Sequence, residues 1–330
     1  MGSYQTVNSV SLSILINIII KCIIESLVCF CTIVLNILII TSLLGIKRLR
    51  TTQHFLLINV SFACIFFSLS CIISISLTMS TLYSKTINSY ICQLIGFIVI
   101  SSCHCLMFSY TLVTFIRFLT IIYPFNKKIT SIQYIKIYLI IKWILAFILP
   151  GISLILPNQQ IIFQPKARLC TISQQSPILF ISFCTGYIIP LILISSMNLI
   201  TYINVACSRQ ILGLSQTKLT RLNKRKRRNL RLLRQFSLFT IIFLFGWTPF
   251  ILIEVIDKEE KLSDIFYLYT LILPSICILI DSSVILHWNK TIYQQIQLWK
   301  QILLRKTEII NDERDYHVTT HEITLMSRNS

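Results

Sequence analysis

The stretch that decides the fold is "FSYTLVTFIRFLTIIYPF", which runs from Phe108 to Phe125. It holds one charged residue, Arg117, and no Lys, Arg, Asp or Glu lies between Lys85 and Arg117. A hydrocarbon core about 30 Å thick needs about 20 consecutive apolar residues in a helix. The run therefore predicts a helix that crosses a membrane, with the arginine near one of its ends.

The composition of the whole chain supports the same prediction. Of its 330 residues, 55% are hydrophobic and 13% are charged, and the mean hydropathy is +0.75. Soluble domains carry about 25% charged residues. The apolar runs are long and lack the period-two alternation of a membrane barrel. We therefore expect an all-α membrane protein whose outer surface contacts membrane lipid.

Seven apolar segments have the length needed to cross a membrane or come close to it. They lie at residues 21–45, 54–78, 90–122, 134–156, 177–206, 232–256 and 265–286. We expect a seven-transmembrane helix bundle over 21–287, after a short N-terminal segment at 1–20. The stretch 288–304 has apolar residues at helical spacing, which predicts a short amphipathic eighth helix at the interface. Residues 305–330 would form a tail.

The distribution of basic residues predicts the orientation. Ten of them lie between Arg209 and Arg234, and others follow the first, third and seventh segments. Cytoplasmic loops carry the excess of Lys and Arg. We expect a multi-pass plasma-membrane protein with its N-terminus outside and its C-terminus in the cytoplasm. The net charge of +18 then reflects orientation, and no nucleic acid is expected as a partner.

Two of the 12 cysteines, Cys92 and Cys170, fall in segments predicted to lie outside. That face is oxidising, so the two can form a disulfide from the third helix to the loop after the fourth; the alternative is two unpaired thiols. Cys92 and Arg117 are 25 positions apart, which is about 38 Å along a helix. Arg117 would therefore lie at the inner membrane face.

Several short motifs now point to one family. They are "IRFLTIIYP" from Ile116 to Pro124, "FLFGWTPF" from Phe243 to Phe250, "LLINVSFACI" from Leu56 to Ile65, and the single residues Asn36, Trp143 and Pro190. In these motifs and their order the chain resembles the rhodopsin-like (class A) G-protein-coupled receptors, as a divergent member. The resemblance implies a receptor, not an enzyme, that binds an extracellular ligand and activates a heterotrimeric G protein through its α subunit. It implies no cofactor.

The resemblance also implies roles for individual residues. For G-protein coupling these are Arg117, Phe118, Tyr123 and Pro124; for a packing switch in the sixth helix, Phe243, Trp247 and Pro249; for polar helix packing, Asn36 and Asp281; and for the ligand pocket, Val99, Tyr187 and Trp247. Glu25 is added to the pocket because charged residues within a membrane helix are functional candidates; the alternative is that it lies at the membrane interface. Proline removes one helical hydrogen bond and kinks the helix, so Pro249 would supply the hinge of the switch.

Four departures from the family pattern affect the expected mechanism. Cys64 stands where the family's helix 2 has Asp, and Ile116 stands where the Asp before the arginine belongs. The helix 7 Asn-Pro-x-x-Tyr motif aligns with "DSSVI", Asp281 to Ile285, and the acidic residue of helix 6 aligns with Asn229. Without carboxylates at 116 and 229 to restrain Arg117, we hypothesise raised basal activity, unless other contacts hold the inactive state.

The ligand is constrained mainly by what the pocket positions lack. The family's amine-binding Asp aligns with Val99, and the lysine that holds retinal aligns near Ser275. A biogenic amine or a retinal ligand is therefore not expected. The acidic segment 254–264 favours a cationic peptide; the alternative is an ordinary solvated loop. Two other functions stay open: a receptor-like protein that does not couple to a G protein, and a small-solute transporter.

The predicted topology can be tested by labelling cysteines introduced into the segment 209–234. We expect a membrane-impermeant thiol reagent to label them only after the cells are permeabilised, because that segment would lie in the cytoplasm. Labelling in intact cells would contradict this orientation.

Overall fold

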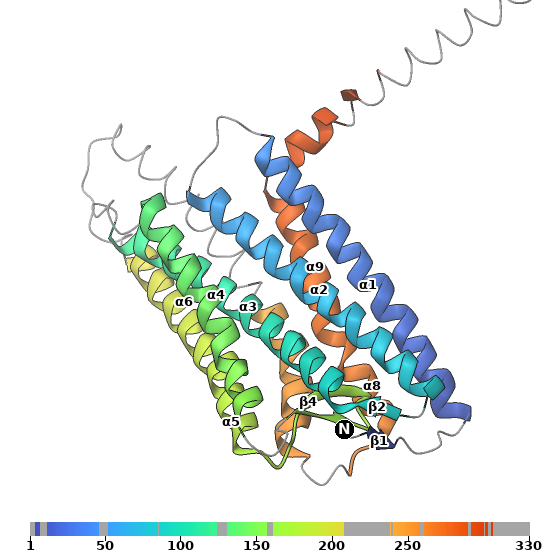
Figure 1. Cartoon of the computed structure of the whole chain (residues 1–330). Helices are drawn as coiled ribbons and strands as arrows, with labels where there is room; N and C mark the ends of the chain where they lie inside the picture. The colour runs from blue at the N-terminus through green and yellow to red at the C-terminus, as the bar shows by residue number, and fades with distance from the viewer. Residues whose placement is uncertain are drawn as a thin grey trace, which may run out of the picture.

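The computed structural model of the chain describes residues 4–6, 12–45, 52–84, 86–123, 131–156, 161–207, 238, 240–257, 261–289, 292–299, 301–302 and 305. Figure 1 shows its helices packed lengthwise as one bundle, with the short strands gathered at one end. This arrangement follows from the sequence, because long apolar segments in hydrocarbon satisfy their backbone groups by forming helices.

The helices of the bundle agree with the predicted segments. In chain order they are α1 (Leu12–Leu44), α2 (Thr52–Ser84), α3 (Ser89–Ile122), α4 (Ile132–Ile155), α5 (Pro177–Phe183), the π-helix η1 (Cys184–Ile188), α6 (Ile189–Cys207), the helix Thr240–Ile256, α8 (Asp264–Thr270) and α9 (Ile272–Trp288). The runs α5–η1–α6 and α8–α9 each act as one span. Six spans among the described residues reach membrane length, and the helix Thr240–Ile256 is a shorter seventh. The all-α, seven-helix prediction is confirmed.

Two boundaries differ from those expected. The first helix begins at Leu12 rather than at 21. Lys21 lies inside this helix and forms an ion pair with Glu25 one turn further along, so its charge does not end the helix. The eighth helix covers 292–299 and 301–302, whereas Trp288 is the last residue of α9. Residues 303–304 and 306–330 lie outside the described residues.

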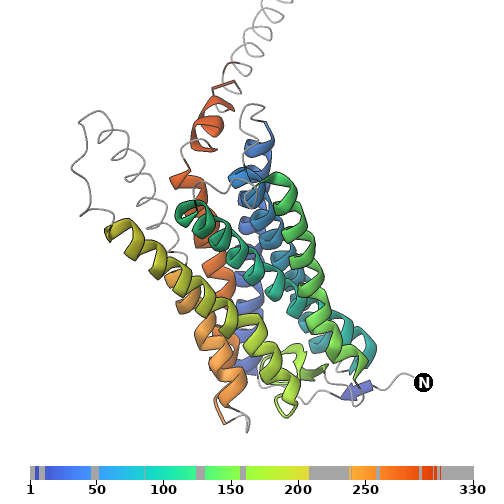
Figure 2. The ribbon, with the colours of Figure 1, turned by 90° about the vertical axis from the view of Figure 1, so that its left-hand side faces the viewer.

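Four short strands form two small sheets that the sequence did not predict. β1 (Tyr4–Thr6) pairs antiparallel with β2 (Thr86–Asn88), and β3 (Ile161–Gln164) pairs antiparallel with β4 (Leu169–Ile172). Figure 2 shows the strands at one end of the bundle, away from the helix at 292–302. We call this the hairpin end, after the β3–β4 hairpin, and the opposite end the Arg117 end.

The hairpin is fastened directly to α3. Cys92 and Cys170 form a disulfide, which confirms that prediction. Gly96 lies beneath the strand, where a Cβ atom would come within 2.9 Å of the Cys170 carbonyl oxygen and 2.5 Å of Cγ2 of Ile161. The Thr78 hydroxyl adds a hydrogen bond of 2.7 Å from α2 to a carbonyl oxygen at the start of β4. The close approach of strand and helix therefore depends on glycine at 96.

A buried lysine ties three helices together deep in the bundle. Lys142 of α4 donates to the Ser109 hydroxyl at 2.8 Å and to the Asn59 side-chain oxygen at 3.3 Å. Its ammonium nitrogen lies 3.9 Å from the centre of the Trp143 ring, whose indole nitrogen also donates to Asn59 at 3.0 Å. Because a buried charge is stable only when it is well solvated by partners, these contacts fix how α2, α3 and α4 face one another.

Replacing Gly96 with alanine tests the fit of β4 on α3. The added methyl group would overlap the backbone of Cys170, so we expect Gly96→Ala to lower the unfolding free energy by about 1–3 kcal/mol. The matched control is Gly151→Ala, whose Cβ would meet only Phe97 at 3.9 Å and should be neutral. Thermal unfolding of the detergent-solubilised protein measures both. Equal melting temperatures for the two variants would contradict the close approach.

Candidate functional site

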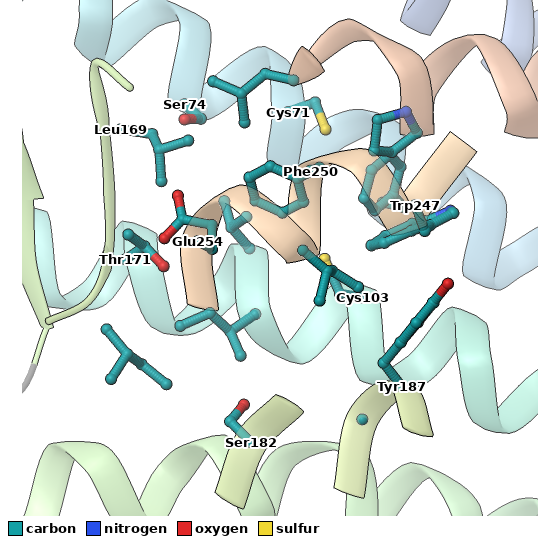
Figure 3. A pocket seen from close by; sticks show the side chains of 18 of the residues that line it. Cys71, Ser74, Cys103, Leu169, Thr171, Ser182, Tyr187, Trp247, Phe250 and Glu254 are labelled. Carbon is teal, nitrogen blue, oxygen red and sulfur yellow. The ribbon is translucent and has the colours of Figure 1, made fainter. Parts of the chain in front are cut away.

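A cavity opens at the hairpin end of the bundle, where the helices spread apart beneath β4. It offers about 170 Å³ to the centres of water-sized molecules. Residues from eight elements line it, including Ile75 of α2, Cys103 of α3 and Thr171 of β4. Figure 3 shows Thr171, Cys103 and Trp247 around the same open space. Most of the lining side chains are apolar, as in typical ligand pockets.

The four residues predicted for the ligand pocket all line this cavity. They come from four different helical segments and are Glu25, Val99, Tyr187 and Trp247. Trp247 is almost fully buried, with 3% of its surface exposed, and Tyr187 is 6% exposed. The fold therefore brings together positions that are up to 222 residues apart in the sequence.

Aromatic rings extend from the cavity into the core. Trp247 stacks on Phe243 with ring centres 5.2 Å apart and planes 11° apart. Phe243 in turn stacks on Tyr187 at 5.9 Å and meets Tyr110 edge-on at 6.2 Å. The Tyr187 hydroxyl lies 2.6 Å from the Thr248 hydroxyl. A displacement of Trp247 would therefore be passed to residues of α3 and η1 by direct contact.

Two of the charged groups of the cavity belong to α1 and neutralise each other. Lys21 Nζ lies 2.6 Å from Glu25 Oε2, and both side chains are 7% exposed. The sequence analysis singled out Glu25 and missed Lys21. The signal was available, because residues four apart lie on the same face of a helix and opposite charges at that spacing attract.

A third charged group, Glu254, lines the cavity from the helix Thr240–Ile256. The sequence analysis grouped it with the acidic segment 254–264. The predicted helix 232–256 also included this residue, and the structure places Glu254 in that helix, where it is 5% exposed rather than in a solvated loop. Gln164 at the end of β3 donates a hydrogen bond of 3.3 Å to its carboxylate. Seven residues separate Glu254 from Trp247, which is about two helical turns, so both face the cavity.

The π-helix η1 accommodates a histidine of α3. His104 is 4% exposed, and its Nδ1 lies 2.9 Å from the carbonyl oxygen of Ile100. A Cβ atom at Gly186 would lie 2.5 Å from His104 Nε2. The glycine therefore leaves the space that the imidazole occupies, and both residues line the cavity. π-Helical turns of this kind are frequent at functional sites.

The described residues that follow the helix Thr240–Ile256 bond to one another and to the hairpin. Asp257 accepts hydrogen bonds from the Tyr267 hydroxyl at 2.7 Å and from the backbone N–H groups of Lys261 and Leu262. The Tyr267 bond, followed by that of the Leu262 N–H, lowers the pKa of the Asp257 carboxyl. Lys166 in the hairpin turn donates to the Leu262 carbonyl oxygen at 2.8 Å. The loop and the hairpin are therefore joined.

Burial also affects a basic residue of the hairpin turn. It lowers the pKa of the Arg168 guanidinium, while the charge of Asp264 opposes that shift. Arg168 has φ 54°, in the left-handed region, where it ends the turn between β3 and β4.

The two residues predicted for polar helix packing each form a hydrogen bond to another helix. Asn36 of α1 is fully buried and donates to the Ser282 hydroxyl of α9 at 2.8 Å. The neighbouring Asp281 accepts from the Tyr110 hydroxyl of α3 at 3.1 Å. Together these bonds connect α9 to both α1 and α3.

The residues predicted for G-protein coupling lie at the far end of α3. Arg117 is half-buried, and Ile116 beside it is buried in the core. Phe118 packs partly against the same core, whereas Tyr123 is the C-terminal cap of α3 and 56% exposed. Pro124 lies outside the described residues, as does Asn229. Nearby, Asn198 of α6 donates to Thr240 at 3.3 Å.

Comparison with known families agrees with this architecture. The family model described as "7 transmembrane receptor (rhodopsin family)" matches residues 35–282. The chain belongs to this family. No match to the receptor is found among curated protein sequences. The match covers most of the receptor's bundle, from the second half of α1 to the Asp281–Ser282 pair of α9.

The sequence analysis missed two features of this receptor. Lys142 and Lys21 were not recognised as buried cations, and the contribution of β4 to the cavity was not foreseen. The lysines left a signal, since each is a charge within a long apolar run, and such charges are functional candidates by default. The hairpin left no such signal in the sequence, because short strands within a loop form only where they pack against another part of the protein.

The contact between Tyr110 and Asp281 can be tested with single and double substitutions. Tyr110→Phe removes the hydroxyl that donates to the buried carboxylate, so we expect a loss of about 1–3 kcal/mol in unfolding free energy. Combining it with Asp281→Leu should recover part of that loss, because both polar partners are then absent. Thermal unfolding of the three variants measures the coupling. Additive effects in the double variant would show that the bond contributes nothing.

Proposed function

We propose that this receptor resides in the plasma membrane with its hairpin end and N-terminus outside the cell. The excess of Lys and Arg between Arg209 and Arg234 and after α9 supports this orientation. The disulfide at the hairpin end also supports it, because disulfides persist in oxidising compartments. On this proposal the bundle core spans 21–287, and the tail 305–330 lies in the cytoplasm.

The cavity then binds an extracellular ligand, and the Arg117 end binds the α subunit of a heterotrimeric G protein. The observation that carries this proposal is the geometry of the cavity floor. Trp247 lies between the open space and a stack of rings that continues to Phe243 and Tyr110. A ligand that contacts Trp247 differently in two packings of these rings shifts their equilibrium.

The two ends of the receptor are joined by α3 and by the helix Thr240–Ile256. Val99 lines the cavity, and Arg117 lies 18 positions further along α3, which is about 27 Å. Pro249 lies inside the helix Thr240–Ile256 and gives it a kink about which its two halves can move. The guanidinium of Arg117 has five donors that can bond to backbone carbonyls of an inserted partner helix.

A peptide is the ligand that the mouth of the cavity favours. Glu254 lines the cavity, and the segment that follows it carries further acidic residues, among them Asp257 and Asp264. A cationic peptide would be attracted by these charges. The absence of a carboxylate at Ile116 supports the hypothesis of raised basal activity. The same departure favours a second candidate function, a receptor-like protein that binds its ligand without coupling.

Basal signalling tests coupling without a known agonist. We expect cells that express the receptor with a panel of Gα subunits to show second-messenger output above vector-only cells, and Arg117→Ala to reduce it to the vector level. The matched control is Lys136→Ala, which removes an exposed charge near the start of α4 and should leave output unchanged. Output equal to vector for every Gα type would favour the non-coupling receptor. An unaffected Arg117→Ala variant would show that the arginine only anchors the helix.

A further inference from the structure

A buried ion pair of α1 faces the cavity but does not connect two helices. Lys21 and Glu25 are both buried and both line the cavity, with Lys21 Nζ 2.6 Å from Glu25 Oε2. The hydrogen bonds of Lys142 and Asp281 join different helices, whereas both members of this pair belong to α1. The bond between them therefore fixes no helix against another.

Such a pair contributes little to the stability of a fold. Opposite charges four positions apart on a helix attract each other only weakly. Taking two charges out of water is costly, and replacing a buried pair with apolar residues is often neutral or stabilising. Charged residues within membrane helices are functional candidates by default. Because folding does not explain this pair and the cavity adjoins it, its role is best explained by what the cavity binds.

The wall formed by α2 leads from the pair to the aromatic floor of the cavity. Phe67 lines the cavity, and its ring centre lies 5.5 Å from that of Trp247. Cys71 lies four positions later on the same face of α2, which is about 6 Å along the helix, and it is close enough to Lys21 for an electrostatic interaction. Figure 3 shows Cys71 and Trp247 around the same open space. A short molecule can therefore reach from Trp247 to the pair.

We propose that Lys21 and Glu25 form a subsite for an amide group of the ligand, whose carbonyl oxygen accepts from Lys21 and whose N–H donates to Glu25. This inference rests on the proposed function, because it assigns a chemical group to the ligand of the same cavity. A lysine ammonium has three donors and a carboxylate has two acceptor oxygens. Both residues can therefore bind the amide while they keep their bond to each other.

Charged groups fit the same subsite less well. An anion would pair with Lys21 and draw it away from Glu25, and a cation would draw Glu25 away from Lys21. Either would leave one buried charge without its partner, which is strongly unfavourable. An amide carries a donor and an acceptor on adjacent atoms and no net charge, so it serves both residues. The ligand that fits has an apolar group on Phe67 and Trp247 and an amide about 6 Å away, as in an aromatic residue with its own backbone amide.

Three small probes of similar shape test this chemistry on the purified receptor. Each has a phenyl ring on a short chain. Phenylpropionamide ends in a donor and an acceptor, its N,N-dimethyl derivative has only the acceptor, and phenylpropionate is an anion. Saturation-transfer difference NMR measures their dissociation constants. We expect phenylpropionamide to bind about tenfold more tightly than either of the others, because only it bonds to both charged residues.

Matched variants identify the source of that preference. The double variant Lys21→Met with Glu25→Leu removes both charges and should bring the affinity ratio of the amide to its dimethyl derivative to about 1, without lowering the melting temperature. The exchanged pair, Lys21→Glu with Glu25→Lys, should keep the preference, because the amide can bind in the reversed direction. Glu254→Gln changes another carboxyl of the cavity and should leave the ratio unchanged.

Three results would overturn the proposal. They are equal affinities of the three probes for the native receptor, a preference for the amide that survives in the apolar double variant, and a markedly lower melting temperature of that variant, which would assign the pair to folding. Loss of the preference in Glu254→Gln would also overturn it, by moving the amide to that residue. None of these measurements depends on coupling, so the signalling test of Arg117 succeeds or fails separately.

Discussion

Polar side chains that enter the hydrocarbon must find their partners inside the bundle, and this constraint orders much of the structure. Lys142 meets Ser109 and Asn59, and Asp281 meets Tyr110. Each bond joins different helices, so each fixes how the helices are rotated about their axes. Hydrophobic burial alone cannot do this, because lipid is as apolar as the core.

The hairpin end applies a second constraint to the same helices. The disulfide and the close approach at Gly96 hold β4 on α3, while Gln164 and Lys166 connect the hairpin to the helix Thr240–Ile256 and the loop that follows it. One side of the roof is thus held covalently and the other by hydrogen bonds. The hairpin is therefore held more firmly on α3 than on the helix Thr240–Ile256.

The departures from the family pattern are connected in space. Cys64 stands where the family's helix 2 carries Asp, and it is buried in the core. The carboxylate at Asp281 of α9 lies within electrostatic reach of it. A carboxyl group is therefore present in the same region of the core, on a different helix and with Tyr110 as a donor.

The amino-acid sequence by itself determined the number of helices, their approximate limits and the disulfide. It could do so because membrane thickness fixes the length of each helix. The family motifs also show which residues of the chain correspond to which positions of the family pattern. Only the tertiary structure decided that Lys21 pairs with Glu25, that Glu254 belongs to a helix facing the cavity, and that β4 covers it. Those facts depend on which helix faces are turned toward each other and on where a loop packs, and neither is set by local propensity or by the apolar pattern of one segment.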